Sequence, residues 1–406
     1  MTDGETRGDP ERVPETNVMS KVPQVTVFFW IIKVLCTTVG ETFSDFFNEH
    51  LGLGLMTTSI AAGALLLGAL VLQLKLKKYV PLVYWLTVVL ISIFGTLLTD
   101  LLTDKLKFPL EYSTIIFIVA LALTFAGWFA KERTLSIHSI FTLRRELFYW
   151  LAILFTFALG TATGDLYAER LGLGYLTTGL IVLGVITTAG IAWRLGLNAV
   201  LAFWIAYILT RPLGASLGDY LSQPPSAGGL GLGATVTSAG FLVAILAVVT
   251  YLAVTQRDFI IDPLKPDTTR NQGRSAVWQS VIVVALLLIA GGTGYKLRRD
   301  QLQKRAATAT STSRPLGDLS SFRQLAQDML TRVHAEDIAG ARSKADQLEK
   351  AWDDAQAVMQ AMNSEKWTTM DSAIDKVLTS IRSSSPPAAP ALNSLLAVIN
   401  SLDKPD

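Results

Sequence analysis

The N-terminal part of the chain repeats one pattern four times. In each copy a tryptophan is followed by a glycine ten residues later, an aspartate fifteen residues later and an acidic or amide residue nineteen residues later. A period that holds over four copies predicts four similar structural units that pack side by side. The tryptophans are Trp30, Trp85, Trp150 and Trp204, the glycines Gly40, Gly95, Gly160 and Gly214, the aspartates Asp45, Asp100, Asp165 and Asp219, and the last members Glu49, Asp104, Glu169 and Gln223.

Long apolar runs carry these repeats. Half of the 406 residues are hydrophobic, 17% are charged and the mean hydropathy is +0.41, which is too apolar for a soluble chain of this length. Each run is about as long as the ~20 apolar residues that cross a bilayer as a helix, whereas a transmembrane barrel would show short alternating segments. The nine predicted spans are residues 24–47, 53–74, 80–101, 110–130, 147–168, 173–193, 198–220, 232–254 and 276–296.

The spans predict an all-α polytopic membrane protein with four parallel two-helix repeats, a ninth transmembrane helix and a small C-terminal soluble helical bundle. Apolar residues spaced three and four apart continue beyond residue 318, which is typical of soluble amphipathic helices. The predicted parts are a disordered polar leader (1–23), the four-repeat domain 24–257 (24–79, 80–140, 147–196 and 198–257), the ninth helix (276–297), a linker (298–317) and the soluble domain (318–406).

The distribution of basic residues predicts the orientation. Loops after the even-numbered spans are rich in Lys and Arg, and such loops stay in the cytoplasm. The N-terminus is therefore expected to be cytoplasmic, and the repeat aspartates and the C-terminal domain to lie on the outer side. A basic run directly after the ninth span opposes this rule, and it consists of Lys296, Arg298, Arg299, Lys304 and Arg305.

Carboxylates inside spanning helices are the candidate functional residues. The aspartates lie about 22 Å along the helix from each tryptophan, toward the outer face, where an ionisable residue costs less than the ~2.5–3.5 kcal/mol of the membrane centre. They either cap helix ends or meet as a ring or as two pairs. Clustered carboxylates and hydroxyls suit hard divalent cations. The predicted ion-binding residues are Asp45, Asp100, Asp165, Asp219, Glu41, Glu49, Glu169 and Asp104, with the four aspartates as metal ligands.

Two cations and several tryptophans also fall in the spans. Lys33 is near enough to the inner end of its span to snorkel, while Arg211, in mid-span, is expected to pair with an aspartate as a counter-ion or gate. The repeat tryptophans, together with Trp128 and Trp193, are interpreted as interfacial belt residues.

The tryptophan–glycine–aspartate register resembles a bacterial membrane-anchored protein family built from four tandem two-helix transmembrane repeats of unknown function. The resemblance covers about residues 24 to 256. It implies a multi-pass protein of the bacterial inner membrane and leaves the activity open.

The residues favour a transporter, with no cofactor. The predicted cargo is a hard divalent cation such as Mn²⁺, exported in exchange for protons, because carboxylates that lie close together share protons.

The alternative is a membrane-embedded sensor or scaffold that presents the C-terminal domain to a partner. No catalytic motif occurs in context, so an enzyme is not expected. The predicted partners are the lipid bilayer, the cation, protons and a possible second copy of the chain. The net charge of +2 gives no indication of nucleic acid.

Overall fold

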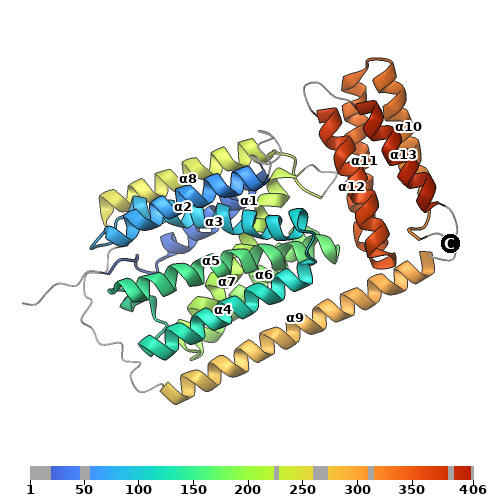
Figure 1. Cartoon of the computed structure of the whole chain (residues 1–406). Coiled ribbons are helices and arrows are strands. Elements are labelled where there is room, and N and C mark those ends of the chain that lie inside the picture. Colours follow the sequence, from blue (N-terminus) through green and yellow to red (C-terminus); the bar gives the residue numbers. More distant parts are fainter. Residues whose placement is uncertain are drawn as a thin grey trace, which may run out of the picture.

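The computed structural model describes residues 20–45, 55–223, 228–258, 273–309, 315–382 and 388–403, and these residues form an all-α structure (Figure 1). Nine of the described helices are long and apolar enough to cross a membrane, as the sequence predicts. They are α1 (Val27–Asp45), α2 (Leu55–Lys75), α3 (Pro81–Asp100), α4 (Leu110–Glu132), α5 (Leu143–Asp165), α6 (Tyr175–Arg194), α7 (Ala199–Ser222), α8 (Ala234–Thr255) and α9 (Gly273–Ala309).

The odd-numbered repeat helices form an inner ring. Helix α1 packs against α3, α3 against α5, α5 against α7, and α7 returns to α1. Between 61% and 67% of each of these helices is buried, whereas the even-numbered repeat helices are only 6% to 33% buried. The first helix of every repeat therefore builds the core, and the second faces outward.

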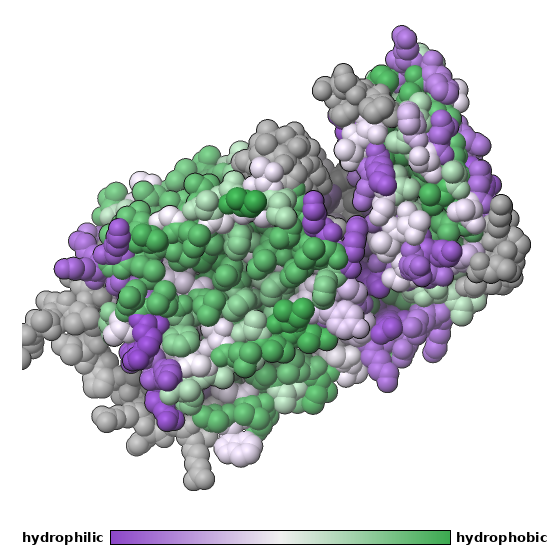
Figure 2. Space-filling view, in the orientation of Figure 1, coloured by the Kyte–Doolittle hydropathy of each residue, from purple (hydrophilic) through white to green (hydrophobic). Residues whose placement is uncertain are grey.

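Each even-numbered helix lies outside the ring against the next odd-numbered one. Helix α2 packs on α3, α4 on α5 and α6 on α7, and α8 closes the circle by packing on α1. The same arrangement repeated four times gives a pseudo-fourfold axis, as expected of repeats that share one orientation. Hydrophobic residues cover this part of the surface, while hydrophilic residues gather at its ends and on the C-terminal helices (Figure 2).

The repeat glycines allow the inner helices to touch. A Cβ atom added at any of the four would overlap the residue that lies three positions before the glycine of the neighbouring repeat. Small residues permit this kind of close approach between membrane helices. The glycines of the register therefore define one ring of helix crossings. The overlapping pairs are Gly40 with Ser92, Gly95 with Phe157, Gly160 with Arg211, and Gly214 with Thr37.

The Leu-Gly-Leu-Gly segments form left-handed turns between the helices of a repeat. In repeat three, Gly172 and Gly174 have φ of 57° and 76°, and in repeat four Gly231 and Gly233 have 75° and 77°. Glycine adopts this conformation without a steric cost. Repeat two lacks the segment, and Lys107 has a φ of 54° instead. The segment after α1 lies outside the described residues.

The C-terminal helices form a bundle with its own core at one end of the ring. Helices α10 (Ser320–His334), α11 (Ile338–Met362), α12 (Ser364–Arg382) and α13 (Ala388–Leu402) pack around buried residues such as Leu348, Met370 and Leu395. Helix α11 also contacts α9 and the π-helical turn η4 (Leu166–Arg170). The bundle therefore lies at the end where the inner helices finish, which we call the carboxylate end (Figure 1).

Several sequence-based expectations need correction. Helix α9 is continuous to Ala309, so residues 298–309 of the predicted linker are helical, because no helix breaker follows the apolar run. In the predicted leader, residues 1–19 lie outside the described residues. Lys21, however, is buried and its Nζ lies 2.6 Å from Glu146 Oε2, an ion pair that joins the first described residues to α5.

The tryptophans are mostly core residues. Trp85, Trp150 and Trp204 are at most 4% exposed, and Trp128, which packs on Trp204, is fully buried. The belt interpretation was wrong for these four, because the repeat tryptophans pack where inner helices meet. Trp193 is 50% exposed, as expected of a belt residue.

The stability of the C-terminal bundle should fall with rising pH. Desolvation, followed by the charges of Glu349, Asp371 and other carboxylates, raises the pKa of Asp353 to about 7. The folded bundle thus holds this proton more tightly than the unfolded chain, so stability is greatest below pH ~4 and is lost as the pH rises through ~7. Because solvent still reaches part of Asp353 and screens these charges, we expect an effect on the order of 1 kcal/mol. Trp352 and Trp367 fluorescence during thermal unfolding at pH 5 and 8 measures it, and Asp353→Asn should flatten the dependence.

Candidate functional site on the axis of the helix ring

Five positions on each inner helix, spaced four residues apart, form a stripe along the ring. Counted from the repeat glycine, they lie eleven, seven and three residues before it and one and five after it. Residues four apart share one helix face, and adjacent positions are about 6 Å apart along the axis. The layers are the aromatic layer (Phe29, Tyr84, Tyr149, Phe203), the Lys33 layer (Lys33, Val88, Ile153, Tyr207), the Arg211 layer (Thr37, Ser92, Phe157, Arg211), the hydroxyl layer (Glu41, Thr96, Thr161, Ala215) and the aspartate layer (Asp45, Asp100, Asp165, Asp219).

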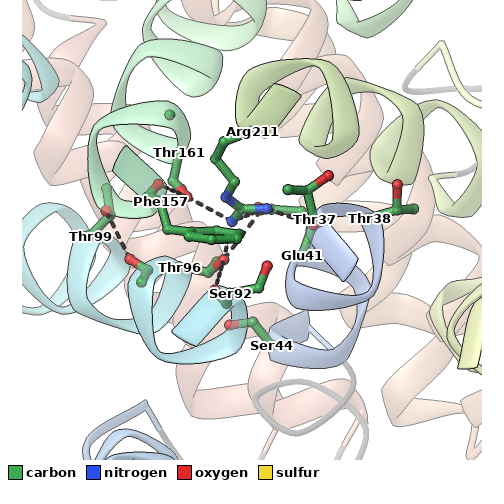
Figure 3. A network of polar contacts seen from close by, with 12 residues as sticks. Thr37, Thr38, Glu41, Ser44, Ser92, Thr96, Thr99, Phe157, Thr161 and Arg211 are labelled. Atoms are coloured by element: carbon green, nitrogen blue, oxygen red, sulfur yellow. Dashed lines mark hydrogen bonds and ion pairs between the residues drawn. The ribbon is translucent and has the colours of Figure 1, made fainter. Parts of the chain in front are cut away.

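Arg211 binds all three other repeats at the centre of the ring. Its Nη2 donates to Glu41 Oε2 at 2.6 Å, to Thr161 Oγ1 at 2.7 Å and to Thr96 Oγ1, and its Nη1 donates to the Thr37 carbonyl at 2.7 Å (Figure 3). The first three acceptors occupy the same register position in repeats one to three. A guanidinium stays charged in proteins, so this fully buried side chain is a fixed positive charge held by Glu41.

The partner of Arg211 differs from the one expected. The sequence predicts an aspartate, but the ion pair forms with Glu41, one turn closer to the centre. The reason is the register, because Arg211 lies three residues before its repeat glycine and the glutamate lies one residue after its own. The aspartates are four residues further along the stripe.

Lys33 is a second buried basic residue on the axis. It is 1% exposed, so the expectation that it snorkels to the membrane surface was wrong. Its Nζ lies 3.6 Å from the centre of the Phe157 ring and 4.2 Å from that of Tyr207, and no described residue accepts a hydrogen bond from it. The Arg211 guanidinium lies 5.7 Å from the same Phe157 ring. The core therefore holds two basic side chains and one acidic side chain, Glu41, between the aromatic and aspartate layers.

Buried tyrosines continue the stripe toward the other end. The hydroxyls of Tyr84 and Tyr149 share a hydrogen bond, and the fully buried Tyr207 interacts with Tyr149 from the neighbouring repeat. Beyond them, Tyr79 donates to Asp258 Oδ2 at 2.5 Å. Burial raises the pKa of the Asp258 carboxyl, although the Tyr79 hydrogen bond opposes this. The axis thus changes from carboxylates at one end, through two basic side chains, to packed aromatic rings.

The repeat aspartates converge at the carboxylate end. Asp165 lies within electrostatic range of Asp100 and Asp219 of the neighbouring repeats, of Glu169 and of Glu41 in the adjacent layer. Ser44 donates to Asp100 Oδ2 at 3.3 Å, and Tyr175 donates to Glu169 Oε1 at 3.3 Å. Asp45 is the last residue of α1; its side chain and that of Asp104 lie outside the described residues, as does Glu49 altogether.

The described aspartates do not act as helix caps. Asp100 and Asp165 each precede a π-helical turn, η2 (Leu101–Lys105) and η4, and neither side chain makes a capping hydrogen bond. Asp219 lies within α7. π-Helical turns are rare and are frequent at functional sites. The interpretation of Asp100 and Asp165 as residues that cap helix ends is therefore not supported.

No preformed metal cluster is found among the described side chains. Within that part of the chain, no three His, Cys, Asp or Glu side chains lie close enough together to hold an ion. The three described aspartates among the proposed ligands, Asp100, Asp165 and Asp219, thus form no coordination shell by themselves. Thr96 and Thr161, which the sequence indicated only as oxygen ligands, bind Arg211. Counting positions from the repeat glycine in steps of four would have indicated this role.

The fold and stripe define a polytopic membrane protein of four tandem two-helix repeats around a polar axis. The four units match the family described as Repeat of Unknown Function (DUF347) at residues 28–79, 83–134, 148–195 and 202–258. The matches cover about half of the chain, and the chain belongs to this family. No curated protein and no solved structure matched the chain.

Proposed function

We propose that the four-repeat ring is a transporter of a hard divalent cation such as Mn²⁺, which moves along the pseudo-fourfold axis. One observation carries the proposal: a single stripe places the aspartates of the repeats at one end of the axis and the Arg211–Glu41 ion pair next to them. Ionisable groups inside a membrane domain are costly and commonly mark ion pathways. Carboxylate oxygens are ligands that hard cations prefer.

Arg211 is proposed to act as the gate of this path. In the present arrangement its guanidinium occupies the axis and neutralises Glu41. A cation gathered by the aspartate layer meets this fixed positive charge, which opposes its passage. Movement of α7 relative to the other inner helices would break the contacts to Glu41, Thr96 and Thr161 together and free a carboxylate for the cation.

Proton coupling and export direction are parts of the same proposal. Carboxylates that interact, such as Asp165 and its neighbours, share protons, so cation binding releases protons. The predicted location is the bacterial inner membrane, with no enzymatic activity and no cofactor.

Neutralising the aspartates should stop transport without unfolding the protein. Asp100→Asn and Asp165→Asn keep size and hydrogen bonding but remove the charge that a cation needs, so we expect Mn²⁺ flux into proteoliposomes to fall at least tenfold. Asp354→Asn, an exposed change in the C-terminal bundle, is the matched control. Normal flux in both axis variants, or absence of flux in the unmodified protein, would contradict the proposal.

Fusion reporters test the orientation. Because basic loops stay in the cytoplasm, reporters placed after Lys78, Arg133 and Arg194 should report cytoplasm, and a reporter placed after Arg170 should report the outer side. The reverse pattern would place the carboxylate end in the cytoplasm.

A sensor is the second candidate, because α11 packs on η4, which directly follows Asp165. A change at the aspartate layer would then reach the C-terminal bundle. A bundle that keeps its cellular effect when expressed without the ring would favour this function over transport.

A further inference from the structure

A cavity of about 220 Å³ lies where the ring, α9 and the C-terminal bundle meet. Its wall includes Glu111 at the start of α4, Arg170 at the end of η4, Tyr295 and Arg299 on α9, Gln360 on α11 and Ser364 on α12. Residues from three separate parts of the chain thus surround one space at the carboxylate end, away from the stripe on the axis.

Two buried polar atoms in this wall lack partners. Arg170 Nε donates to Glu111 Oε1 at 3.4 Å, but its Nη1 is buried and makes no hydrogen bond with any described residue. Gln360 Oε1 is buried and unpartnered in the same sense. A buried polar group without a partner costs about 1–3 kcal/mol, so both atoms indicate a missing ligand. Because amide oxygen and nitrogen are assigned by their surroundings, Gln360 can accept or donate.

The charges of the wall favour an anion. Arg170 and Arg299 contribute two guanidinium groups, while the single carboxylate, Glu111, already accepts hydrogen bonds from Arg170 and from Tyr295 at 3.2 Å. Guanidinium groups bind phosphate through paired, charge-assisted hydrogen bonds. Gln360 and Ser364 would bind hydroxyl groups attached to that phosphate.

The cavity lies at the level where lipid headgroups are expected. The span of α4 begins at Leu110 and that of α5 and η4 ends at Arg170. The exposed apolar run of α9 reaches Leu297, and Arg298 donates to the Leu171 and Gly172 carbonyls just beyond it. Basic residues at a membrane boundary attract anionic headgroups.

We propose that this cavity binds a phosphoryl group carrying a small polyol, such as the glycerophosphate headgroup of an anionic lipid or the free compound. The ligand joins Arg170 of the ring to Arg299 of α9 and Gln360 of the bundle, so its binding fixes the C-terminal bundle on the carboxylate end. The site is independent of transport along the axis.

The test is thermal unfolding of the full chain in nanodiscs. Phosphatidylglycerol added to phosphatidylcholine nanodiscs should raise the unfolding midpoint by roughly 3–6 °C, and sn-glycerol 3-phosphate added to phosphatidylcholine nanodiscs tests the soluble source. In Arg299→Gln, the half-saturating concentration should rise about tenfold, because one charge-assisted contact is lost. Arg305→Gln, an exposed change on the same helix outside the cavity, is the control.

A response to either phosphate source that Arg299→Gln weakens and Arg305→Gln keeps supports the site, and the source that acts identifies the ligand. Gln360→Leu should weaken the response without changing the charge of the protein. A weaker response in this variant therefore distinguishes specific binding in the cavity from general electrostatic attraction between the protein and the phosphate. The proposal is overturned if neither source shifts the midpoint of the unmodified protein, or if Arg305→Gln loses as much as Arg299→Gln.

Discussion

Replacing Arg211 with glutamine should destabilise the protein by about 3–5 kcal/mol, because it leaves Glu41 as an unpaired buried carboxylate. The same change removes hydrogen bonds to the Thr96 and Thr161 hydroxyls and to the Thr37 carbonyl. All three other repeats therefore lose their hydrogen bonds to the Arg211 side chain at once. The measurement is the unfolding midpoint of the purified protein in detergent.

A double variant separates the charge from the packing. Arg211→Gln combined with Glu41→Gln removes both charges, so it should be more stable than either single variant by at least ~1 kcal/mol. Arg194→Gln, an exposed arginine at the end of α6, should stay within about 0.5 kcal/mol of the unmodified protein. If the double variant loses the sum of the two single losses, Arg211 and Glu41 are not coupled and the gate as described is wrong.

Replacing Lys33 with methionine should have the opposite effect and stabilise the protein. The two aromatic contacts of the ammonium group contribute about 0.5–2 kcal/mol each. Burial of this basic group costs several kcal/mol, and no described residue accepts hydrogen bonds from its Nζ. Methionine fills a similar volume without that cost, so we expect a gain on the order of 1–4 kcal/mol.

The same variant should transport more slowly. Because a buried lysine without hydrogen-bond acceptors lowers stability, we expect Lys33 to serve transport at the expense of stability. The experiment compares unfolding midpoints and Mn²⁺ flux for Lys33→Met and for Lys75→Met, an exposed lysine at the end of α2. A lower midpoint for Lys33→Met would show that Lys33 is a structural residue of the ring.

The repeat register predicted much of the fold because each of its positions has one physical role. The glycines mark helix crossings, the aspartates mark one end of the inner helices, and the apolar runs mark spans. Four identical spacings could therefore indicate four parallel units. The order of the ring, with α8 closing on α1, follows from packing between repeats, which a single sequence does not contain.

The central contacts were not predictable from residue type alone. Arg211 and Glu41 occupy positions at which the other repeats carry different residues, so the repeat comparison treated them as exceptions. Trp85 and Trp204 were interpreted by their distance from the membrane surface, yet they are buried because they pack between helices. In a bundle, a position near the membrane boundary can still lie inside the protein. The packing of neighbouring helices decides whether its side chain is buried or faces the lipid.

The most direct measurement is anomalous diffraction at the manganese edge from crystals of the full chain grown with Mn²⁺. The transport proposal predicts a peak on the pseudo-fourfold axis, in the aspartate layer between Asp100, Asp165 and Asp219 and beyond the Arg211–Glu41 pair. The peak should disappear in Asp165→Asn. A peak away from the axis, or none at a concentration that saturates transport, would contradict it.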